Sequence, residues 1–155
     1  MEIPLIGRNI SKLNLSYNME NKLKHLEFIQ NIITRMNTNS FQIKGMSITI
    51  TAALLALTAS DYNISYISIV YFALFVFWGL DAYYLSQEKG YRKLYEEVRA
   101  YTAEQIDFNL KLKKEYTEGA NSWKHVLLNK TIWTLYSLQA SIALVLILVF
   151  KFYDK

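Results

Sequence analysis

The chain has 155 residues, of which 52% are hydrophobic and 19% are charged, and it contains no cysteine. This length favours a single domain, and the lack of cysteine excludes disulfide bonds, thiolate metal ligands and cysteine nucleophiles. The net charge of +4 would favour nucleic-acid binding in a soluble protein, but lysine and arginine beside a membrane explain it better here. We therefore expect no nucleic-acid partner.

The N-terminal part of the chain, residues 1–40, is expected to lie beside the membrane. Residues 1–18 are polar and contain a proline and a glycine, which predicts a loosely ordered lead-in. Residues 19–36 carry apolar side chains every three or four positions, as in an amphipathic helix. This helix either packs against a partner helix, which we favour, or lies in the membrane interface. The polar run 37–40 is expected to end it and to cap the next helix.

Two long apolar runs predict a transmembrane hairpin. Residues 41–60 and 64–85 each have about the length of a helix that crosses a bilayer, roughly 17 to 25 residues. The connection between them has no lysine or arginine, whereas residues 1–45 have six and residues 86–130 have nine. The positive-inside rule therefore places the N-terminus and residues 86–130 in the cytoplasm, with the tip of the hairpin outside.

The second transmembrane helix is expected to continue into the cytoplasm. Good helix formers follow Asp81 as far as about Ala103, which predicts a helical stalk. Residues 104–122 include a strand-like alternation, but a single strand would have no partner, so a further helix or an ordered loop is expected. The sequence Gly-Ala-Asn-Ser at 119–122 is the clearest turn signal. A third apolar run, 131–153, predicts another transmembrane helix and leaves the short C-terminal tail outside.

These elements predict an all-α fold. The expected architecture is an integral membrane helical bundle with three transmembrane helices, an amphipathic N-terminal helix and a cytoplasmic helical extension of the second transmembrane helix. Residues 1–155 would form a single membrane domain.

The sequence contains no motif that indicates catalysis. A nucleophile elbow, a paired metal-ligand spacing and a glycine-rich phosphate loop are all missing, and no arginine is followed by histidine as in HEPN ribonucleases. His25 and His125 are interpreted as surface or interface residues. We therefore predict that the protein is not an enzyme, has no catalytic or metal-binding residues, and uses no cofactor.

Charged residues are expected to gather at the inner membrane surface. Lys44 begins the first apolar run and Asp81 ends the second, so an antiparallel hairpin brings them to the same level. An ion pair would lower the cost of a carboxylate close to the hydrocarbon. The pair either fixes the register of the hairpin, which we favour, or acts as a gate, a ligand contact or a lining charge of a pore.

Further polar residues extend this hypothesis. If the N-terminal helix packs against the stalk, four more charged residues could join the network: Glu27, Arg35, Glu88 and Arg92. Within the third transmembrane helix, Gln139 is the candidate for a hydrogen bond between helices, most simply as a structural contact.

A resemblance to a known group rests on two segments, KLKHLEFIQNIITRMNTNSFQIKG (Lys22–Gly45) and FWGLDAYYLSQEKGYRKLYEEVR (Phe77–Arg99). They are similar to segments of a widespread group of small, uncharacterised bacterial multi-pass membrane proteins. The resemblance covers about the first two thirds of the chain, and it implies location and architecture but no mechanism. The layout also resembles the small multi-pass membrane effectors of bacterial antiphage systems.

The function hypotheses follow from location. We expect a protein of the bacterial inner membrane whose partners are the lipid bilayer, further copies of itself and a cytoplasmic protein. The leading hypothesis is a self-assembling membrane effector that opens or perturbs the bilayer when its cytoplasmic part receives a signal. The alternative is an accessory or scaffold subunit that holds a cytoplasmic partner at the membrane, and a membrane enzyme or transporter comes third.

Overall fold

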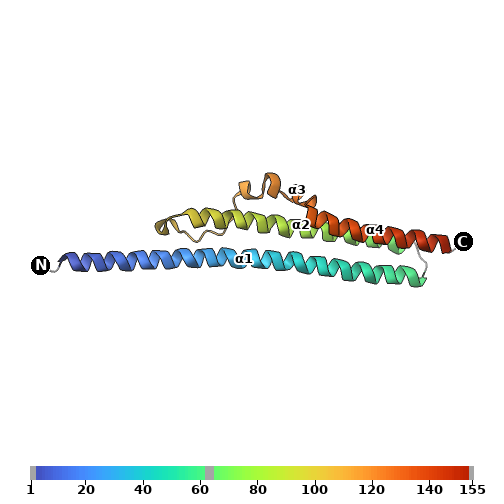
Figure 1. Ribbon diagram of the computed structural model, residues 1–155, viewed down its shortest axis with the longest axis horizontal. Coiled ribbons are helices and arrows are strands. Elements are labelled where there is room, and N and C mark those ends of the chain that lie inside the picture. Colours follow the sequence, from blue (N-terminus) through green and yellow to red (C-terminus); the bar gives the residue numbers. More distant parts are fainter. Residues whose placement is uncertain (1–2, 62–64, 154–155) are drawn as a thin grey trace.

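The computed structural model is a long helical hairpin with a third long helix packed along one half of it (Figure 1). The structure describes residues 3–61 and 65–153, with the side chains of residues 13–60, 67–149 and 152. Within these ranges there is no β-strand. The elements are α1 (Ile3–Asp61), α2 (Ser65–Ala100), three 3₁₀ turns η1 (Ala103–Gln105), η2 (Lys114–Thr117) and η3 (Gly119–Asn121), α3 (Trp123–Leu127) and α4 (Lys130–Tyr153).

Three of these helices, α1, α2 and α4, are long and apolar enough to cross a membrane. They contain the three predicted transmembrane runs, except for residue 64, which lies outside the described residues. The prediction of an all-helical fold with three candidate membrane spans is therefore confirmed. Helix α2 continues past its apolar run to Ala100, three residues before the expected end of the stalk. The C-terminal end of α4 lies at the same end of the molecule as the C-terminal end of α1 and the start of α2 (Figure 1).

Helix α1 corrects two predictions. It is one helix of 59 residues, about 88 Å long at 1.5 Å per residue. Residues 3–18 are helical, so the expected loose lead-in is wrong over this range. Pro4 is compatible with this helix because it lies in the first turn, where the backbone N–H has no partner in any helix.

The polar run 37–40 continues α1, although it was expected to end a helix. Its side chains find partners on α2 that hold the backbone in the helix. The Asn37 amide donates to Glu88 at 3.3 Å, and the Ser40 hydroxyl donates to Asp81 at 2.5 Å. Such tertiary contacts outweigh the small differences in intrinsic helix propensity.

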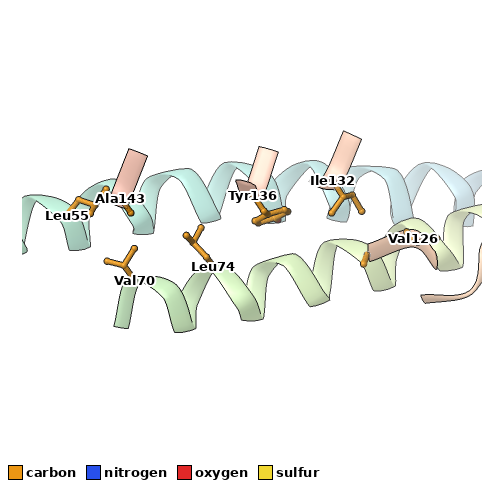
Figure 2. Close-up of a cluster of buried hydrophobic side chains, with 8 residues drawn as sticks. Leu55, Val70, Leu74, Val126, Ile132, Tyr136 and Ala143 are labelled. Atoms are coloured by element: carbon orange, nitrogen blue, oxygen red, sulfur yellow. The ribbon is translucent and has the colours of Figure 1, made fainter. Parts of the chain in front are cut away.

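Two hydrophobic clusters hold the bundle together. The first joins all four α-helices, and Figure 2 shows seven of its side chains converging between α1, α2 and α4. Its buried members are Leu55, Val70, Leu74, Ala82, Val126, Ile132, Tyr136 and Ala143. The second lies further from the α1–α2 connection and consists of Ile29, Ile33, Leu94, Val98 and Tyr116. Because residues 19–36 contribute to this second cluster, the N-terminal helix packs on a partner helix, as favoured, and does not lie apart from the bundle.

Residues 101–122 form an ordered loop that returns along the stalk. The apolar members of the alternating stretch, Ile106, Leu110 and Leu112, pack against the second cluster, which explains the strand-like pattern without a strand. The loop comes very close to α2 at Gly90. A Cβ there would lie 3.0 Å from Thr117 Cγ2 and 3.1 Å from Leu112 Cδ1. Glycine therefore allows this close approach.

The predicted turn at 119–122 leads into α3. Gly119 has a φ of +58°, a conformation that costs glycine little, and the Ser122 hydroxyl caps α3 by accepting from the His125 N–H. Two tryptophans then fix α3 to α2. The Trp123 indole donates to the Gly79 carbonyl at 2.9 Å, and the Trp78 indole donates to the Leu127 carbonyl at 3.0 Å. Trp78 and Trp123 therefore anchor the start of the last helix.

Candidate functional site

The face of α1 that packs against α2 and α4 changes along the helix. Near the second cluster it carries the large apolar residues Ile29 and Ile33. Within the apolar run 41–60 it carries small polar residues together with Leu55, while most other bulky side chains of the run are exposed. The buried polar residues of this face are Ser40, Ser47, Thr51 and Thr58. Small residues inside and bulky apolar residues outside are typical of a helix that packs closely within a membrane.

Asp81 forms the centre of the site. Its side chain is fully buried, and its Oδ1 atom accepts hydrogen bonds from Ser40 Oγ at 2.5 Å and from Lys44 Nζ at 2.6 Å. Lys44 Nζ also donates to Ser40 Oγ at 2.7 Å. The carboxylate charge is thus compensated within one helical turn of α1. The second carboxylate oxygen, Oδ2, is buried and has no hydrogen-bond partner among the described residues.

A second polar contact repeats this arrangement one heptad away. Glu88 is almost fully buried, binds Arg92 Nη2 at 2.8 Å and accepts from Asn37. Seven residues separate Asn37 from Lys44, and seven separate Asp81 from Glu88. The two contacts therefore belong to one antiparallel register of α1 and α2, which both of them fix.

Glu27 and Arg35 do not join these contacts. Both are exposed, and neither takes part in an ion pair or a side-chain hydrogen bond within the described part of the chain. Each is two residues from a core position, Ile29 or Ile33, and two residues correspond to about 200° around a helix. The two side chains consequently point away from α2.

Gln139 extends the polar contacts to α4. Its amide nitrogen donates to Ser47 Oγ at 3.0 Å, and Ser47 Oγ lies 3.2 Å from the amide oxygen. Tyr136, one turn earlier on α4, is buried, and its hydroxyl donates to the Phe77 carbonyl on α2 at 3.3 Å. Polar residues of all three long helices therefore lie where these helices pack against one another.

We call the polar residues on these contacting helix faces the polar seam. It consists of Asn37, Ser40, Lys44, Ser47, Thr51 and Thr58 on α1, Asp81 and Glu88 on α2, and Tyr136 and Gln139 on α4. Sequence reasoning missed Asn37, Ser40, Ser47 and Tyr136. The seven-residue spacing of Ser40 with Ser47, and of Lys44 with Thr51 and Thr58, is the signal that predicts a shared helix face.

Among the residues described by the structure, no three histidine or acidic side chains come together as metal ligands. His25, a candidate interface residue, is buried in the loop contact, with its ring 5.4 Å from that of Phe108.

Comparisons with protein families, curated proteins and solved structures give no match for this chain. The resemblance to small bacterial membrane proteins therefore stays a prediction, and the function must be inferred from the polar seam and the surfaces of the bundle.

Proposed function

We propose that the protein is a non-enzymatic effector of the bacterial inner membrane that self-assembles and opens a path through the bilayer as part of a defence or signalling system. The polar seam is the observation that carries this proposal. Polar and charged residues within membrane segments are costly, and they commonly line the pathways of ions or protons. In this proposal the N-terminus and residues 86–130 face the cytoplasm.

The proposed closed state is the bundle itself. The buried part of the seam lies between α1, α2 and α4, and the Lys44–Asp81 ion pair closes it on the proposed cytoplasmic side, one heptad from the Asn37–Glu88 contact. To open the seam, α1 must move or turn relative to the other two helices. The polar contacts that oppose this motion are the ion pair and the Ser47–Gln139 hydrogen bonds, and the apolar residues of α1 in the two hydrophobic clusters oppose it as well. In an assembly, the seams exposed on neighbouring copies would then line a shared path.

The test is inducible expression in cells that carry a membrane-potential dye. We expect the wild-type chain to depolarise the membrane, and the Asp81→Asn variant, which loses the ion pair, to do so at lower expression. Glu104→Gln, which changes an exposed loop carboxylate, is the matched control and should behave like wild type. The proposal fails if the membrane-inserted wild-type chain never depolarises cells, either alone or together with the products of neighbouring genes.

A scaffold function is the second candidate, because the bundle exposes an aromatic pair outside the apolar run of α1. The rings of Phe28 and Phe108 lie 6.2 Å apart, and both side chains are exposed. Phe108 has a φ of +54°, a rare conformation for a residue with a side chain. Such a patch fits a cytoplasmic protein partner. A detergent pull-down should then yield one stoichiometric partner that the Phe28→Ser variant no longer binds.

A further inference from the structure

The N-terminal end of α1 extends beyond the rest of the bundle. Near this end, the Lys22 ammonium fixes α1 to the end of the stalk by donating to the carbonyls of Arg99 and Tyr101 at 2.9 and 2.7 Å. Figure 1 shows the helix continuing past this point without a neighbouring element. We call residues 3–21 the overhang. An unsupported helix of this length is only marginally stable in water.

The overhang exposes an apolar stripe. Leu13 and Tyr17 are 69% and 65% exposed. Toward the N-terminus the sequence continues their spacing with Ile10, Ile6 and Ile3, which gives steps of three and four residues. This spacing is that of the a and d positions of a coiled coil.

The stripe is restricted to the overhang. Continuing the same spacing along α1 leads only to exposed polar residues: Glu20, Lys24, Glu27, Asn31 and Thr34. The core residues Ile29 and Ile33 follow Leu13 and Tyr17 by 16 residues, which is about 160° around the helix. Leu13 and Tyr17 therefore point away from the side on which α2 packs, and a longer α2 would not cover them.

Lipid does not account for the stripe. Residue 13 lies 28 residues before the apolar run that begins at residue 41, about 42 Å along a continuous helix. In the proposed orientation the stripe is thus far from the bilayer. Its occupant must be a protein surface.

Charge favours a second copy of this chain as that occupant. The positions that flank the stripe, e and g of the heptad, are Gly7, Asn9, Asn14, Ser16 and Asn21. None is charged, so identical helices would not repel each other and no oppositely charged partner is selected. A membrane also gives all copies the same orientation, which brings identical stripes together in parallel.

The same side of α1 also permits close contact within the membrane run. Thr49 and Ala53 follow Leu13 and Tyr17 by 36 residues, ten full turns of an ideal helix. Together with Gly45 they form an exposed series of small residues at four-residue spacing, and nothing lies within 4 Å of a Cβ built on Gly45. Small residues at this spacing let membrane helices approach closely.

We propose that the overhangs of several copies form a parallel, in-register coiled coil along the stripe. This inference rests on the self-assembly part of the proposed function and specifies which surface mediates it. A stripe of two heptads is short for a coiled coil, but confinement in one membrane raises the effective concentration of the helices. Because the stripe is short, we expect the coiled coil to form reversibly, which suits a protein that responds to a signal.

The absence of cysteine gives a direct test. Single variants Leu13→Cys, Tyr17→Cys and Leu15→Cys of the full chain are oxidised in native membranes. Leu15 is the matched control, because it is 57% exposed and lies on the opposite side of the helix. We expect disulfide-linked dimers of the Leu13→Cys and Tyr17→Cys variants, at least tenfold more than of Leu15→Cys. Equal cross-linking at the three positions, or none at Leu13 and Tyr17, would overturn the inference.

A second variant separates this inference from the proposed function. Leu13→Asp should abolish cross-linking of Tyr17→Cys while membrane insertion and helix content remain unchanged, because Leu13 makes no contact in the bundle core. If cross-linking follows the stripe but cells are never depolarised, the coiled coil stands and the effector function fails. If cells are depolarised without cross-linking along the stripe, the effector function stands and this inference fails.

Discussion

The ammonium of Lys44 lies 2.6 Å from the carboxylate of Asp81, and the two partners differ sharply in their access to solvent. The Lys44 side chain keeps 23% of its surface exposed, whereas Asp81 is fully buried. A lysine with a flexible stem can turn toward water or lipid headgroups when its partner is removed. A buried carboxylate has no such alternative.

This asymmetry predicts unequal effects of the two substitutions. Lys44→Gln leaves an unpaired buried charge and should reduce the free energy of unfolding by about 3 kcal/mol. Asp81→Asn keeps the shape of the side chain and frees Lys44, so its cost should be nearer 1 kcal/mol. The double variant should lose less than the sum of the two. Unfolding by titration with a denaturing detergent measures all three, and strictly additive losses would show that the residues are not coupled.

The hydrogen bonds between Ser47 and Gln139 should contribute a modest amount to the stability of the bundle. Ser47→Ala leaves the Gln139 amide without its partner on α1, and we expect a loss of about 0.6 to 1.7 kcal/mol. Ser141→Ala is the matched control, because Ser141 is exposed and bonds only to the Ser137 carbonyl of its own helix. The same detergent titration compares the two variants. Equal losses would mean that the contact between α1 and α4 contributes nothing.

Gly90 should control how tightly the loop packs on the stalk. A leucine at this position would displace Leu112 and Thr117, and such overpacking typically costs about 1 to 3 kcal/mol. We expect trypsin to cleave Gly90→Leu in the loop, at lysines such as Lys111 and Lys113, roughly tenfold faster than wild type, since 1.4 kcal/mol is a factor of ten. Gly45→Leu, where nothing lies within 4 Å, should leave loop cleavage unchanged. Unchanged cleavage of Gly90→Leu would refute the role of this glycine.

Lys113 should make the loop contact sensitive to alkali. A hydrogen bond to the Glu97 carboxylate, 2.6 Å away, raises the pKa of Lys113 above its usual value of 10.5. The contribution of this ion pair is therefore complete below pH 10.5 and is lost as the pH rises through the folded-state pKa.

The difference in thermal stability between wild type and Lys113→Met measures this contribution. It should be small but constant from about pH 7 to 9, as expected of an exposed pair, and should shrink above about pH 10.5. Tyr101 also hydrogen-bonds to Glu97, so the comparison is repeated in a Tyr101→Phe background. A difference that persists unchanged at high pH would contradict the assignment.

The three candidate membrane-spanning helices were predictable from the sequence because they depend on local properties. The length of each apolar run predicted the three spans. The ends of the first two runs predicted the level at which Lys44 and Asp81 meet. The continuity of α1 through residues 37–40 was not predictable in this way. Asn37 and Ser40 are poor helix formers by themselves, and the acceptors that keep them helical lie more than 40 residues away on α2.

The members of the candidate site were predicted less well, for a related reason. Glu27 and Arg35 were selected because they are charged, but their phase relative to Ile29 and Ile33 places them on the outer side of α1. Ser40, Ser47 and Tyr136 carry no charge, and their role depends on which helices meet. The phase of α1 could be read from the sequence. Which residues of α1 and α2 the helix α4 contacts could be read only from the fold.

The continuity of α1 has a mechanical consequence. A single helix that runs from the overhang to the level of Asp81 transmits a rotation from one end to the other, because its backbone hydrogen bonds resist twisting over its whole length. Turning the overhang about its long axis therefore turns Ser40 and Lys44 by a similar angle. Since 100° separates adjacent residues, a rotation of one residue position is enough to carry both side chains out of reach of the carboxylate. Twisting of the overhang, more than 20 residues away from Lys44, would therefore break the Lys44–Asp81 ion pair.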